Sequence, residues 1–588
     1  MKWPNTIQGI QLPNRVRGGA ALAVFASVGV FVAFCPDELG RWMIQHLGYY
    51  FTFAGVALIG VCLYRINPFH RLRAIRLSQW LACLAALLLG SWLLFIHGEF
   101  GNKIAMDDYI LASSARNFHE SKQYVVTDQV QMYESRYEPV ATHVDKRPWL
   151  FPFLVSVVHD VIGFRPGNTF LVNAFFGVAF LLLVYLLGNF LAGTKAGFLA
   201  VLLWVSLPLL AQNATGGGME MLNLFWLHLV FLCSCWYLRC PCRSREGLLS
   251  ITAVLLAYAR YESVLFLIPV LIVIIVGWVR EKRCFLSWGS ILSVAILLGA
   301  LLQLKSYVGS EDGWELTRGA TQAFALAYLP GNLLHALAYF YSFDDTLANS
   351  LFLSLLGVLC LIGFLVLFRS QWSRLWRTEA LGAVFIVFAP FIVLNLLFLL
   401  CFHAARLDSP FVSRYALPFH ALLVFSILYV WRHLGEHWPR VAFWKLAYFV
   451  LAAFLLGFTL PMNAKAVFTE RNFAIREQLW LEDLSRGKIR KDSLVIDAFQ
   501  IPWAYRDWFC LSPGSARSLS YYLVDMVKTG EVSGIHYVER LYLKNGNWVP
   551  DRPDDTLGPG FELELMAERS FRPFMLTRVY RVVNIGEK

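Results

Sequence analysis

The chain has 588 residues, of which 57% are hydrophobic and only 15% are charged, and its mean hydropathy is +0.54. Soluble domains carry roughly 25% charged residues, so this composition excludes a soluble enzyme, a disordered chain and a fibrous repeat. The formal net charge of +11 leaves two explanations, which are nucleic-acid binding and the excess of Lys and Arg in the cytoplasmic loops of a membrane protein.

Many segments have the roughly 20 apolar residues that a bilayer-spanning helix needs. The strongest candidates are residues 17–35, 47–64, 78–97, 168–192, 197–213, 219–238, 285–304, 350–368, 380–402, 415–431 and 441–460. Arg and Lys cluster in the connections at 65–76, 239–245, 280–283 and 369–377, which we therefore expect to be cytoplasmic. This arrangement explains the positive charge, and we expect no nucleic-acid partner.

Two further apolar stretches fit the charge pattern in only one way each. Residues 149–164 must not cross the membrane, so they are predicted to form an interfacial helix with its apolar face on the lipid. Residues 247–279 must cross twice, as a hairpin bent near Arg260. The sequence thus predicts an α-helical polytopic membrane protein with about 13 transmembrane helices, a cytoplasmic N-terminus and an extracytoplasmic C-terminus.

The last segment, residues 461–588, is polar enough to fold in water. A helix-like stretch at 470–486, a strand-like stretch at 494–499, the turn signal Asn545-Gly546 and an alternating run at 574–583 predict a small extracytoplasmic α/β domain. We divide the chain into an N-terminal two-span extension (1–77), a main transmembrane region (78–460) whose first large outer loop is 98–167, and this outer domain.

Acidic residues near the predicted outer membrane face are the first candidates for chemistry. Asp107 and Asp108 follow a span, and two carboxylates in a poorly solvated cleft repel each other, so one can be held as a general base. The alternative is a helix cap that the helix dipole favours. Glu220 follows three glycines, 216–218, which either let the backbone approach a ligand closely or form a tight turn.

Three cations lie near the same face. Arg260 interrupts an apolar hairpin, which is costly unless it meets an anion or Glu262. Lys146 and Arg414 either bind an anion or extend toward lipid headgroups. The outer loop at 305–349, which includes Trp314, either covers the cleft as a lid or packs at the membrane interface.

The order of these features resembles the GT-C superfamily of polyprenyl-phosphate-sugar-dependent glycosyltransferases. A span is followed by Asp107-Asp108-Tyr109, then by Asp145-Lys146-Arg147-Pro148-Trp149 at the start of the interfacial helix. Residues 256–262 and 413–418 are similar to later segments of the superfamily. The most similar subgroup is the bacterial one that contains aminoarabinose transferases and protein O-mannosyltransferase-like enzymes, and the resemblance covers about residues 78–460.

The chain departs from the family pattern in three places. Asp108 stands where Glu is commoner, residues 146–149 replace a tighter Lys-Pro-Pro segment, and two extra spans precede residue 78. The first change keeps a carboxylate, so the catalytic expectation survives it. The second leaves the details of carrier binding open.

The resemblance implies a transferase of the cell inner membrane that moves a hexosyl or pentosyl group from a polyprenyl-phosphate donor to an extracytoplasmic lipid, glycan or protein. It implies catalytic roles for Asp107, Asp108 and Glu220, and donor-phosphate binding by Lys146, Arg260 and Arg414. The three acidic residues would also be the ligands if a divalent cation, Mg or Mn, takes part. Inversion at the anomeric carbon is expected.

Two other classes of protein remain open at this point. A lipid or solute transporter, such as a flippase, would have a similar number of spans, but it should show repeated halves, and no repeat is found. A non-catalytic membrane scaffold would keep the architecture without needing Asp107.

Overall fold

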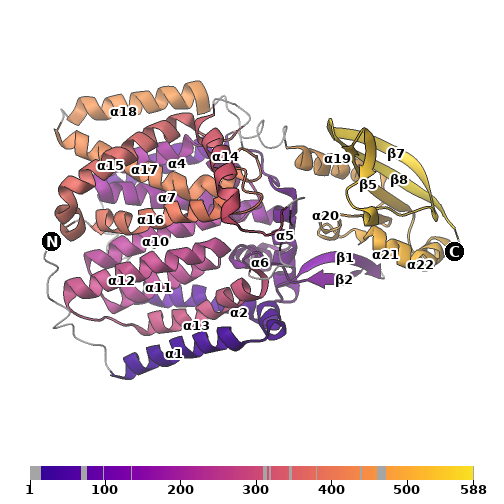
Figure 1. The fold of residues 1–588 in the computed structure, drawn as a ribbon, viewed down its shortest axis with the longest axis horizontal. Helices are drawn as coiled ribbons and strands as arrows, with labels where there is room; N and C mark the ends of the chain where they lie inside the picture. The colour runs from indigo at the N-terminus through magenta and orange to yellow at the C-terminus, as the bar shows by residue number, and fades with distance from the viewer. Residues whose placement is uncertain are drawn as a thin grey trace.

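The computed structural model describes residues 15–67, 76–96, 98–133, 136–308, 314, 316, 320–342, 347–378, 380–437, 440–459 and 472–586. The protein has a large helical body and a smaller β-rich domain at one end of it (Figure 1). Strands β1 and β2 extend from the body toward that domain.

The helices of the body differ widely in length. They are α1 (Arg15–Phe34), α2 (Asp37–Ile66), α4 (Leu77–Phe95), α5 (Ala105–Glu120), α6 (Leu150–Ile162), α7 (Asn168–Ala192), α8 (Thr194–Val205), α9 (Pro208–Ala214), α10 (Glu220–Arg239), α11 (Arg243–Ala257), α12 (Leu267–Glu281), α13 (Trp288–Gln303), α14 (Leu329–Tyr341), α15 (Leu351–Thr378), α16 (Ala380–Leu400), α17 (Leu417–His437) and α18 (Arg440–Phe454). Short 3₁₀ or π turns are η1 (Tyr261–Phe266), η2 (Leu304–Val308), η4 (Leu326–Tyr328), η5 (Ser413–Ala416) and η6 (Leu455–Thr459).

The body is that of an integral membrane protein. Nine helices in the described part of the chain are long and apolar enough to cross a membrane, and the bent pair α8–α9 makes a tenth if it is counted as one span. The spans that begin at Glu220 and at Ser413 form the centre, since 78% of the residues in the apolar stretch of each are buried, whereas the span of α1 lies at the rim with large apolar side chains exposed. The sequence-based count of 13 spans stays a prediction.

The predicted break at Arg260 is confirmed. Helix α11 ends at Ala257, Arg260 adopts an extended conformation, and the chain turns back through η1 into α12. The carbonyl of Tyr258 accepts a hydrogen bond from the backbone N–H of Leu150, so the start of α6 lies against this break.

The helix predicted at 149–164 is present as α6, but the prediction that its apolar face lies on the lipid is wrong for most of that face. Phe151, Phe153 and Val155 are buried in the main core and α6 packs against α5. Val161, on the other side, remains exposed. The reason is that α5 is itself amphipathic and covers α6, which the sequence of α6 alone does not reveal.

The β-rich domain is built on one mixed sheet. Its strands are β1 (Val126–Tyr133), β2 (Arg136–His143), β3 (Leu494–Asp497), β4 (Phe509–Leu511), β5 (Ile535–Lys544), β6 (Asn547–Pro550), β7 (Phe561–Arg572) and β8 (Met575–Ile585). The order is β2-β1-β4-β3-β5-β8-β7, with β6 paired to β5, and β3 is parallel to both β4 and β5. The accompanying helices are α19 (Phe473–Lys488), α20 (Ile501–Ala504), α21 (Pro513–Ser518), α22 (Ser520–Thr529) and η8 (Pro553–Asp555).

The elements predicted in this α/β domain are present. The predicted helix and first strand correspond to α19 and β3, although residues 470 and 471 lie outside the described residues. Asn545 and Gly546 join β5 to β6 with φ angles of 53° and 80°, as a two-residue hairpin turn requires. The last predicted strand corresponds to β8.

The sheet also includes two strands that the sequence did not predict, β1 and β2 from the first outer loop. Val130 of β1 pairs with Cys510 of β4. A salt bridge of 2.7 Å between Arg116 of α5 and Asp507 fastens the same loop to the domain. The β-rich domain is therefore attached to the loop that carries Asp107, and it helps to fix that loop above the helices.

Candidate active site

The acidic and basic side chains at the end of the body nearest the β-rich domain form one continuous network of ion pairs. Four carboxylates and three guanidinium groups alternate, so that each guanidinium lies between two carboxylates. In order, the network consists of Asp145, Arg147, Asp107, Arg414, Glu220, Arg260 and Glu262.

Asp107 lies in the first turn of α5, and both of its carboxylate oxygens are engaged. Oδ1 accepts hydrogen bonds from Nε and Nη2 of Arg147 at 3.0 and 2.5 Å, and Oδ2 accepts one from Arg414 Nη2. Burial raises the pKa of the Asp107 carboxyl, but the two guanidinium groups outweigh burial and hold this pKa well below its usual value. Asp107 is therefore ionised at physiological pH in this state.

Arg147 is held in place from several sides. Its Nη1 donates to both oxygens of Asp145, at 3.0 and 2.8 Å. Its carbonyl accepts hydrogen bonds from the Tyr124 hydroxyl and, at 2.6 Å, from Gln303 Nε2 at the end of α13. The guanidinium beside Asp107 is thus positioned by the surrounding structure.

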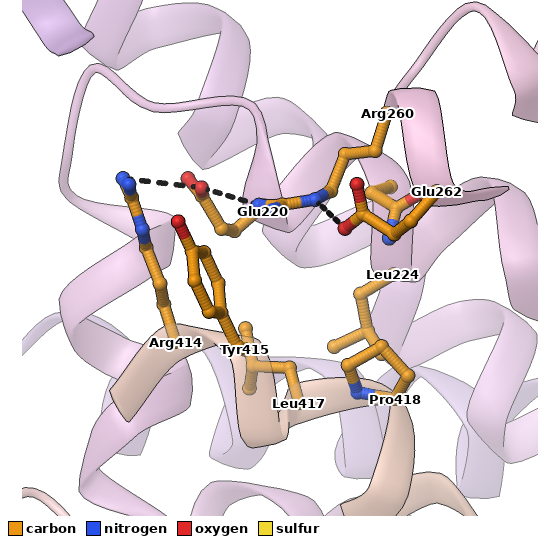
Figure 2. Close-up of a pocket in the computed structure, with 9 residues that line it drawn as sticks. Glu220, Leu224, Arg260, Glu262, Arg414, Tyr415, Leu417 and Pro418 are labelled. Carbon is orange, nitrogen blue, oxygen red and sulfur yellow. Dashed lines mark hydrogen bonds and ion pairs between the residues drawn. The ribbon is translucent and has the colours of Figure 1, made fainter. Parts of the chain in front are cut away.

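Glu220, at the start of α10, joins the other two arginines (Figure 2). Its Oε1 accepts a hydrogen bond from Arg260 Nη1 at 2.7 Å and lies 3.2 Å from Arg414 Nη1. Arg260 Nε donates to Glu262, so the pair with Glu262 that the sequence allowed is present together with a second partner. The ring of Tyr415 lies 4.9 Å from the guanidinium carbon of Arg260 and 5.3 Å from that of Arg414.

The pocket beside these groups is very small in this state. Glu220, Arg260, Glu262, Arg414 and Tyr415 line a volume of about 10 Å³, enough for about one water molecule. Within the described part of the chain, Arg414 Nε, Glu220 Oε2 and Glu262 Oε2 are buried without a hydrogen-bond partner. A larger anion would have to displace existing ion pairs to reach the arginines, and it would satisfy Arg414 Nε by doing so.

Asp108 is almost fully buried and makes different contacts from its neighbour Asp107. Its Oδ2 accepts hydrogen bonds from the backbone N–H groups of Lys103 and Ile104, at 2.7 and 3.2 Å, so it ties the preceding loop to the start of α5. Among the described residues, its Oδ1 has no hydrogen-bond partner. Burial raises the pKa of Asp108 to about 7, against the effect of the two backbone hydrogen bonds, and the nearby Glu220 adds to the rise.

Two of the three glycines before Glu220 lie close to acidic side chains of the site. A Cβ on Gly217 would lie 3.3 Å from Cβ of Asp108, and a Cβ on Gly218 would overlap Oε2 of Glu220. Asn173 Nδ2 holds this turn by donating to the carbonyls of Gly216 and Gly218, at 2.8 and 2.7 Å. The turn therefore brings the backbone close to two acidic side chains of the site.

Lys146 lines a larger cavity outside the network. Its Nζ lies 4.4 Å from the centre of the Trp314 ring, and both residues border a volume of about 470 Å³ between the first outer loop and residues 498–501 of the β-rich domain. Asp145 and Arg147 also line it, so this outer cavity adjoins the network. Its size is within the range of small-molecule pockets.

A histidine–aspartate pair lies at the wall of the outer cavity. His143 Nδ1 is 2.6 Å from Asp128 Oδ2, and both residues line the cavity. Burial lowers the pKa of His143, but the hydrogen bond and charge of Asp128 outweigh burial and raise it. The outer cavity thus has both charged and aromatic surfaces, the latter from Tyr307, Trp314 and Phe499.

The structure brings four of the six predicted site residues, Asp107, Glu220, Arg260 and Arg414, into direct contact through the network. The residue that the sequence reasoning missed is Arg147, which contacts Asp107 where Lys146 had been expected to contribute a cation. Lys146 and Arg147 lie in a bend after β2, and the sequence does not reveal which of these two adjacent cations faces Asp107.

Two of the three carboxylates named as ligands for a divalent cation are already engaged with arginines. Asp107 and Glu220 each lie between two guanidinium groups. Across the described ranges, no group of three or more His, Cys, Asp or Glu residues is arranged to hold a metal ion. A divalent cation at this position would have to displace arginines.

No protein-family model and no curated protein matches the chain. Among solved structures, it is similar to ArnT from Cupriavidus metallidurans bound to undecaprenyl phosphate, with 12% identity, a TM-score of 0.45, and coverage of 87% of this chain and 100% of that chain. It is also similar to the apo form of the Archaeoglobus fulgidus oligosaccharyltransferase, with 10% identity, a TM-score of 0.42, and coverage of 82% of this chain and 75% of that chain.

At such identities and TM-scores below 0.5, the likeness assigns neither an activity nor a substrate to this chain.

Proposed function

We propose that this protein is an integral membrane glycosyltransferase that moves a sugar from a polyprenyl-phosphate donor to an extracytoplasmic acceptor, with inversion. The observation that carries the proposal is the position of Asp107, a carboxylate only 16% exposed between two guanidinium groups, one of which, that of Arg147, lines a cavity large enough for a sugar. This arrangement supplies a proton acceptor and an anion site within one cluster.

The arginines suit a phosphate leaving group. Negative charge grows on the phosphate oxygen as the glycosidic bond breaks, and preformed cations in a water-poor site stabilise it. Arg414 and Arg147 are attractive partners because planar guanidinium groups bind phosphate through two parallel hydrogen bonds. Arg414 Nε, buried without a hydrogen-bond partner among the described residues, gives one donor for such a bond.

Donor binding would also activate Asp107. A phosphate that takes over Arg147 and Arg414 removes the positive charge that keeps the pKa of Asp107 low, so this pKa rises toward the range of a useful base. Asp107 then accepts the proton of the acceptor hydroxyl or amine while that atom bonds to the anomeric carbon. The bond from this carbon to the phosphate oxygen breaks, and its electron pair leaves with the phosphate.

The other predicted residues receive supporting roles in this proposal. Glu220 positions Arg260 and Arg414, and Asp108 fixes the start of α5. Lys146 lies at the outer cavity, where we propose that the sugar or the acceptor enters between aromatic surfaces. The acceptor class, whether lipid, glycan or protein, is left open.

We further propose that the protein lies in the cell inner membrane with its N-terminus in the cytoplasm and the β-rich domain outside. The basic connections support this orientation, because Lys and Arg are retained on the cytoplasmic side. The carrier tail would lie along the body, with its phosphate at the network.

The proposal is tested by sugar transfer in membranes that contain Asp107→Asn. We expect transfer from labelled polyprenyl-phosphate sugars to fall at least about 100-fold, which is the lower range for loss of a general base. Asp160→Asn is the matched control, because Asp160 pairs with Lys122 at 2.8 Å and His119 at 2.6 Å, and both pairs are partly exposed. Both variants must be recovered as monodisperse protein in similar yield.

Near-normal transfer by folded Asp107→Asn protein would overturn the assignment of the base. If the wild-type protein transfers no sugar but drives gradient-coupled uptake in proteoliposomes, it is a transporter. If the wild-type protein shows neither activity, a non-catalytic membrane scaffold is favoured.

A further inference from the structure

A second pocket lies at the opposite end of the helical body from the candidate active site. It has a volume of about 150 Å³ and is formed where α1, α2, α11 and the start of α13 meet. Its lining includes Arg17 of α1, Arg65 of α2, Arg243 and Ser244 of α11, and Trp288 of α13. We refer to it as the basic pocket.

Helix α2 shows how far apart the two sites are. Arg41 of α2 lines the outer cavity and Arg65 lines the basic pocket. Helical residues rise 1.5 Å each, so these positions are separated by roughly 36 Å along the helix axis, about the thickness of a membrane. The basic pocket therefore lies at the other membrane face and takes no part in the chemistry at Asp107.

The charge of the basic pocket is one-sided. Three arginines line it, and no Asp or Glu does. Arg17 Nη1 is buried, and across the described ranges it has no hydrogen-bond partner. A cationic group in that situation is costly unless an anion meets it.

Glu246, the sequence neighbour of the lining residue Gly247, has hydrogen-bond partners outside the pocket. Glu246, one turn into α11, accepts hydrogen bonds from Trp278 Nε1 at 2.8 Å, from Ser290 Oγ at 2.9 Å and from the backbone N–H of Ser287 at 3.2 Å. It therefore holds α11, α12 and α13 together. Its negative charge reaches Arg243, but among the described residues it forms no ion pair with any of the three pocket arginines.

Two helix N-termini add to the positive potential. Helix α11 begins at Arg243 and α13 begins at Trp288, and both ends border the pocket. Gly247 and Gly289 let the two backbones approach closely, since a Cβ on Gly289 would lie 2.9 Å from Cα of Gly247. Each helix N-terminus carries a partial positive charge that favours an anion.

The remaining wall of the pocket is apolar and faces the side of the body. Val61 of α2 and Leu292 of α13 line the pocket and are 47% and 50% exposed, and the ring of Trp288 is 45% exposed. A ligand with a phosphate and an attached hydrocarbon chain fits both surfaces, whereas a free phosphate uses only the basic one.

We propose that the basic pocket binds the phosphate headgroup of an anionic phospholipid, with an acyl chain along Val61 and Leu292. The site lies between the first two helices and the rest of the body, so the bound lipid links the N-terminal extension to α11 and α13. Basic pockets between helices at a membrane face bind such headgroups through this combination of charge and apolar contact.

The test compares lipid binding by the full-length protein in nanodiscs of phosphatidylglycerol and phosphatidylcholine. For the wild type we expect retained phosphatidylglycerol after extraction, measured by native mass spectrometry, and a higher melting temperature in phosphatidylglycerol than in phosphatidylcholine. In R17Q/R243Q we expect retained phosphatidylglycerol to fall at least about fivefold, because two of the three cations are gone.

Two further variants separate charge from folding. R76Q/R283Q removes two cations at the same face outside the pocket lining and should bind phosphatidylglycerol like the wild type. R17K/R243K keeps the charge and should retain most of the binding. Equal losses in R17Q/R243Q and R76Q/R283Q, or no preference of the wild type for phosphatidylglycerol, would overturn the proposal.

A titration with inorganic pyrophosphate in lipid-free detergent distinguishes the two sources of phosphate. We expect a smaller rise in melting temperature than phosphatidylglycerol gives, because the apolar wall stays empty. A rise as large as that given by phosphatidylglycerol, and lost in R17Q/R243Q, would assign the pocket to a soluble phosphate compound and overturn the lipid assignment.

Discussion

At the scale of single residues, Asp107 and Asp108 illustrate how neighbours in sequence acquire different chemistry. Two guanidinium groups hold the pKa of Asp107 well below its ordinary value, although burial acts in the other direction. Burial raises the pKa of Asp108 to about 7. Carboxylates whose pKa values are pushed apart commonly take separate roles in catalysis, and here the neighbouring arginines decide which carboxylate stays ionised.

The first prediction separates Arg147 from Lys146. Replacing Arg147 by Gln removes one of the two cations at Asp107 and leaves Asp145 with the backbone N–H of residue 147 in place of a guanidinium partner, so we expect sugar transfer to fall at least about 100-fold. Lys146→Gln should lower transfer by less than about tenfold, because Lys146 contacts Trp314 at the outer cavity. Initial rates of transfer from a labelled donor are measured for both variants. A greater fall in rate for K146Q than for R147Q would mean that Lys146, and not Arg147, contacts the donor phosphate.

The second prediction concerns the pH-dependent destabilisation of the native state by Asp108. Native Asp108 keeps its proton up to about pH 7, whereas an unfolded aspartic acid loses it near 3.8, so the native state binds more protons between these values. Stability therefore falls as the pH rises from about 4 to about 7, and the loss persists above that. Asp108→Asn lacks this loss, and its melting temperature relative to the wild type should increase over that range.

Differential scanning fluorimetry in detergent at pH 4 to 8 measures the effect. Asp160→Asn serves as the control, because the pKa of Asp160 is lowered, mainly by hydrogen bonds from Lys122 and His119 that outweigh its burial, and its removal should not produce such an increase. A difference between D108N and the wild type that stays constant across the range would contradict the raised pKa.

At the scale of elements, the turn before α10 sets the position of Glu220. The third prediction is that Gly218→Ala lowers sugar transfer at least about tenfold and destabilises the fold by about 1–3 kcal/mol, because the new Cβ overlaps Oε2 of Glu220. Gly101→Ala is the matched control, since a Cβ there meets no atom within 4 Å. Transfer rate and melting temperature are measured on both, and equal behaviour would mean that Glu220 tolerates displacement.

The elements that could be predicted are those governed by local physics. A membrane span can be predicted from the sequence because crossing a bilayer requires a long apolar helix. The break at Arg260 can be predicted because a charged side chain inside such a stretch is costly. The hairpin turn at Asn545-Gly546 can be predicted because its backbone needs positive φ at both positions, which Asn and Gly adopt readily.

The elements that escaped prediction depend on distant partners. Strand β1 reads Val-Thr-Asp-Gln-Val-Gln-Met-Tyr, a polar sequence, and Val130 finds its pair at Cys510, far along the chain. The burial of α6 depends on the apolar side of α5, since an apolar helix face packs equally well on lipid or on protein. In the site, Arg147 and not Lys146 faces Asp107, and this depends on how the loop after β2 is held by Gln303, which donates a hydrogen bond to the carbonyl of Arg147.

At the scale of the whole molecule, charge is divided between the two ends of the helices. The alternating network balances its arginines with carboxylates, whereas the basic pocket at the other end leaves three arginines without a carboxylate in its lining. Helix α10 connects the two faces, because Glu220 begins it and Cys240 follows its last residue, roughly 30 Å away along the axis. The membrane orientation can therefore be measured on one helix.

The fourth prediction uses Cys240, which is exposed, and Asp554, whose side chain is 95% exposed in the β-rich domain. In a C401S background, which removes the partly exposed Cys401 at the end of α16, a membrane-impermeant maleimide should label D554C in intact cells and leave Cys240 unmodified. Permeabilised cells should show labelling at both positions, as mapped by peptide mass spectrometry. Because the positive-inside rule places the basic end of α10 in the cytoplasm, labelling of Cys240 in intact cells would reverse the proposed orientation and move the network at Asp107 to the cytoplasmic face.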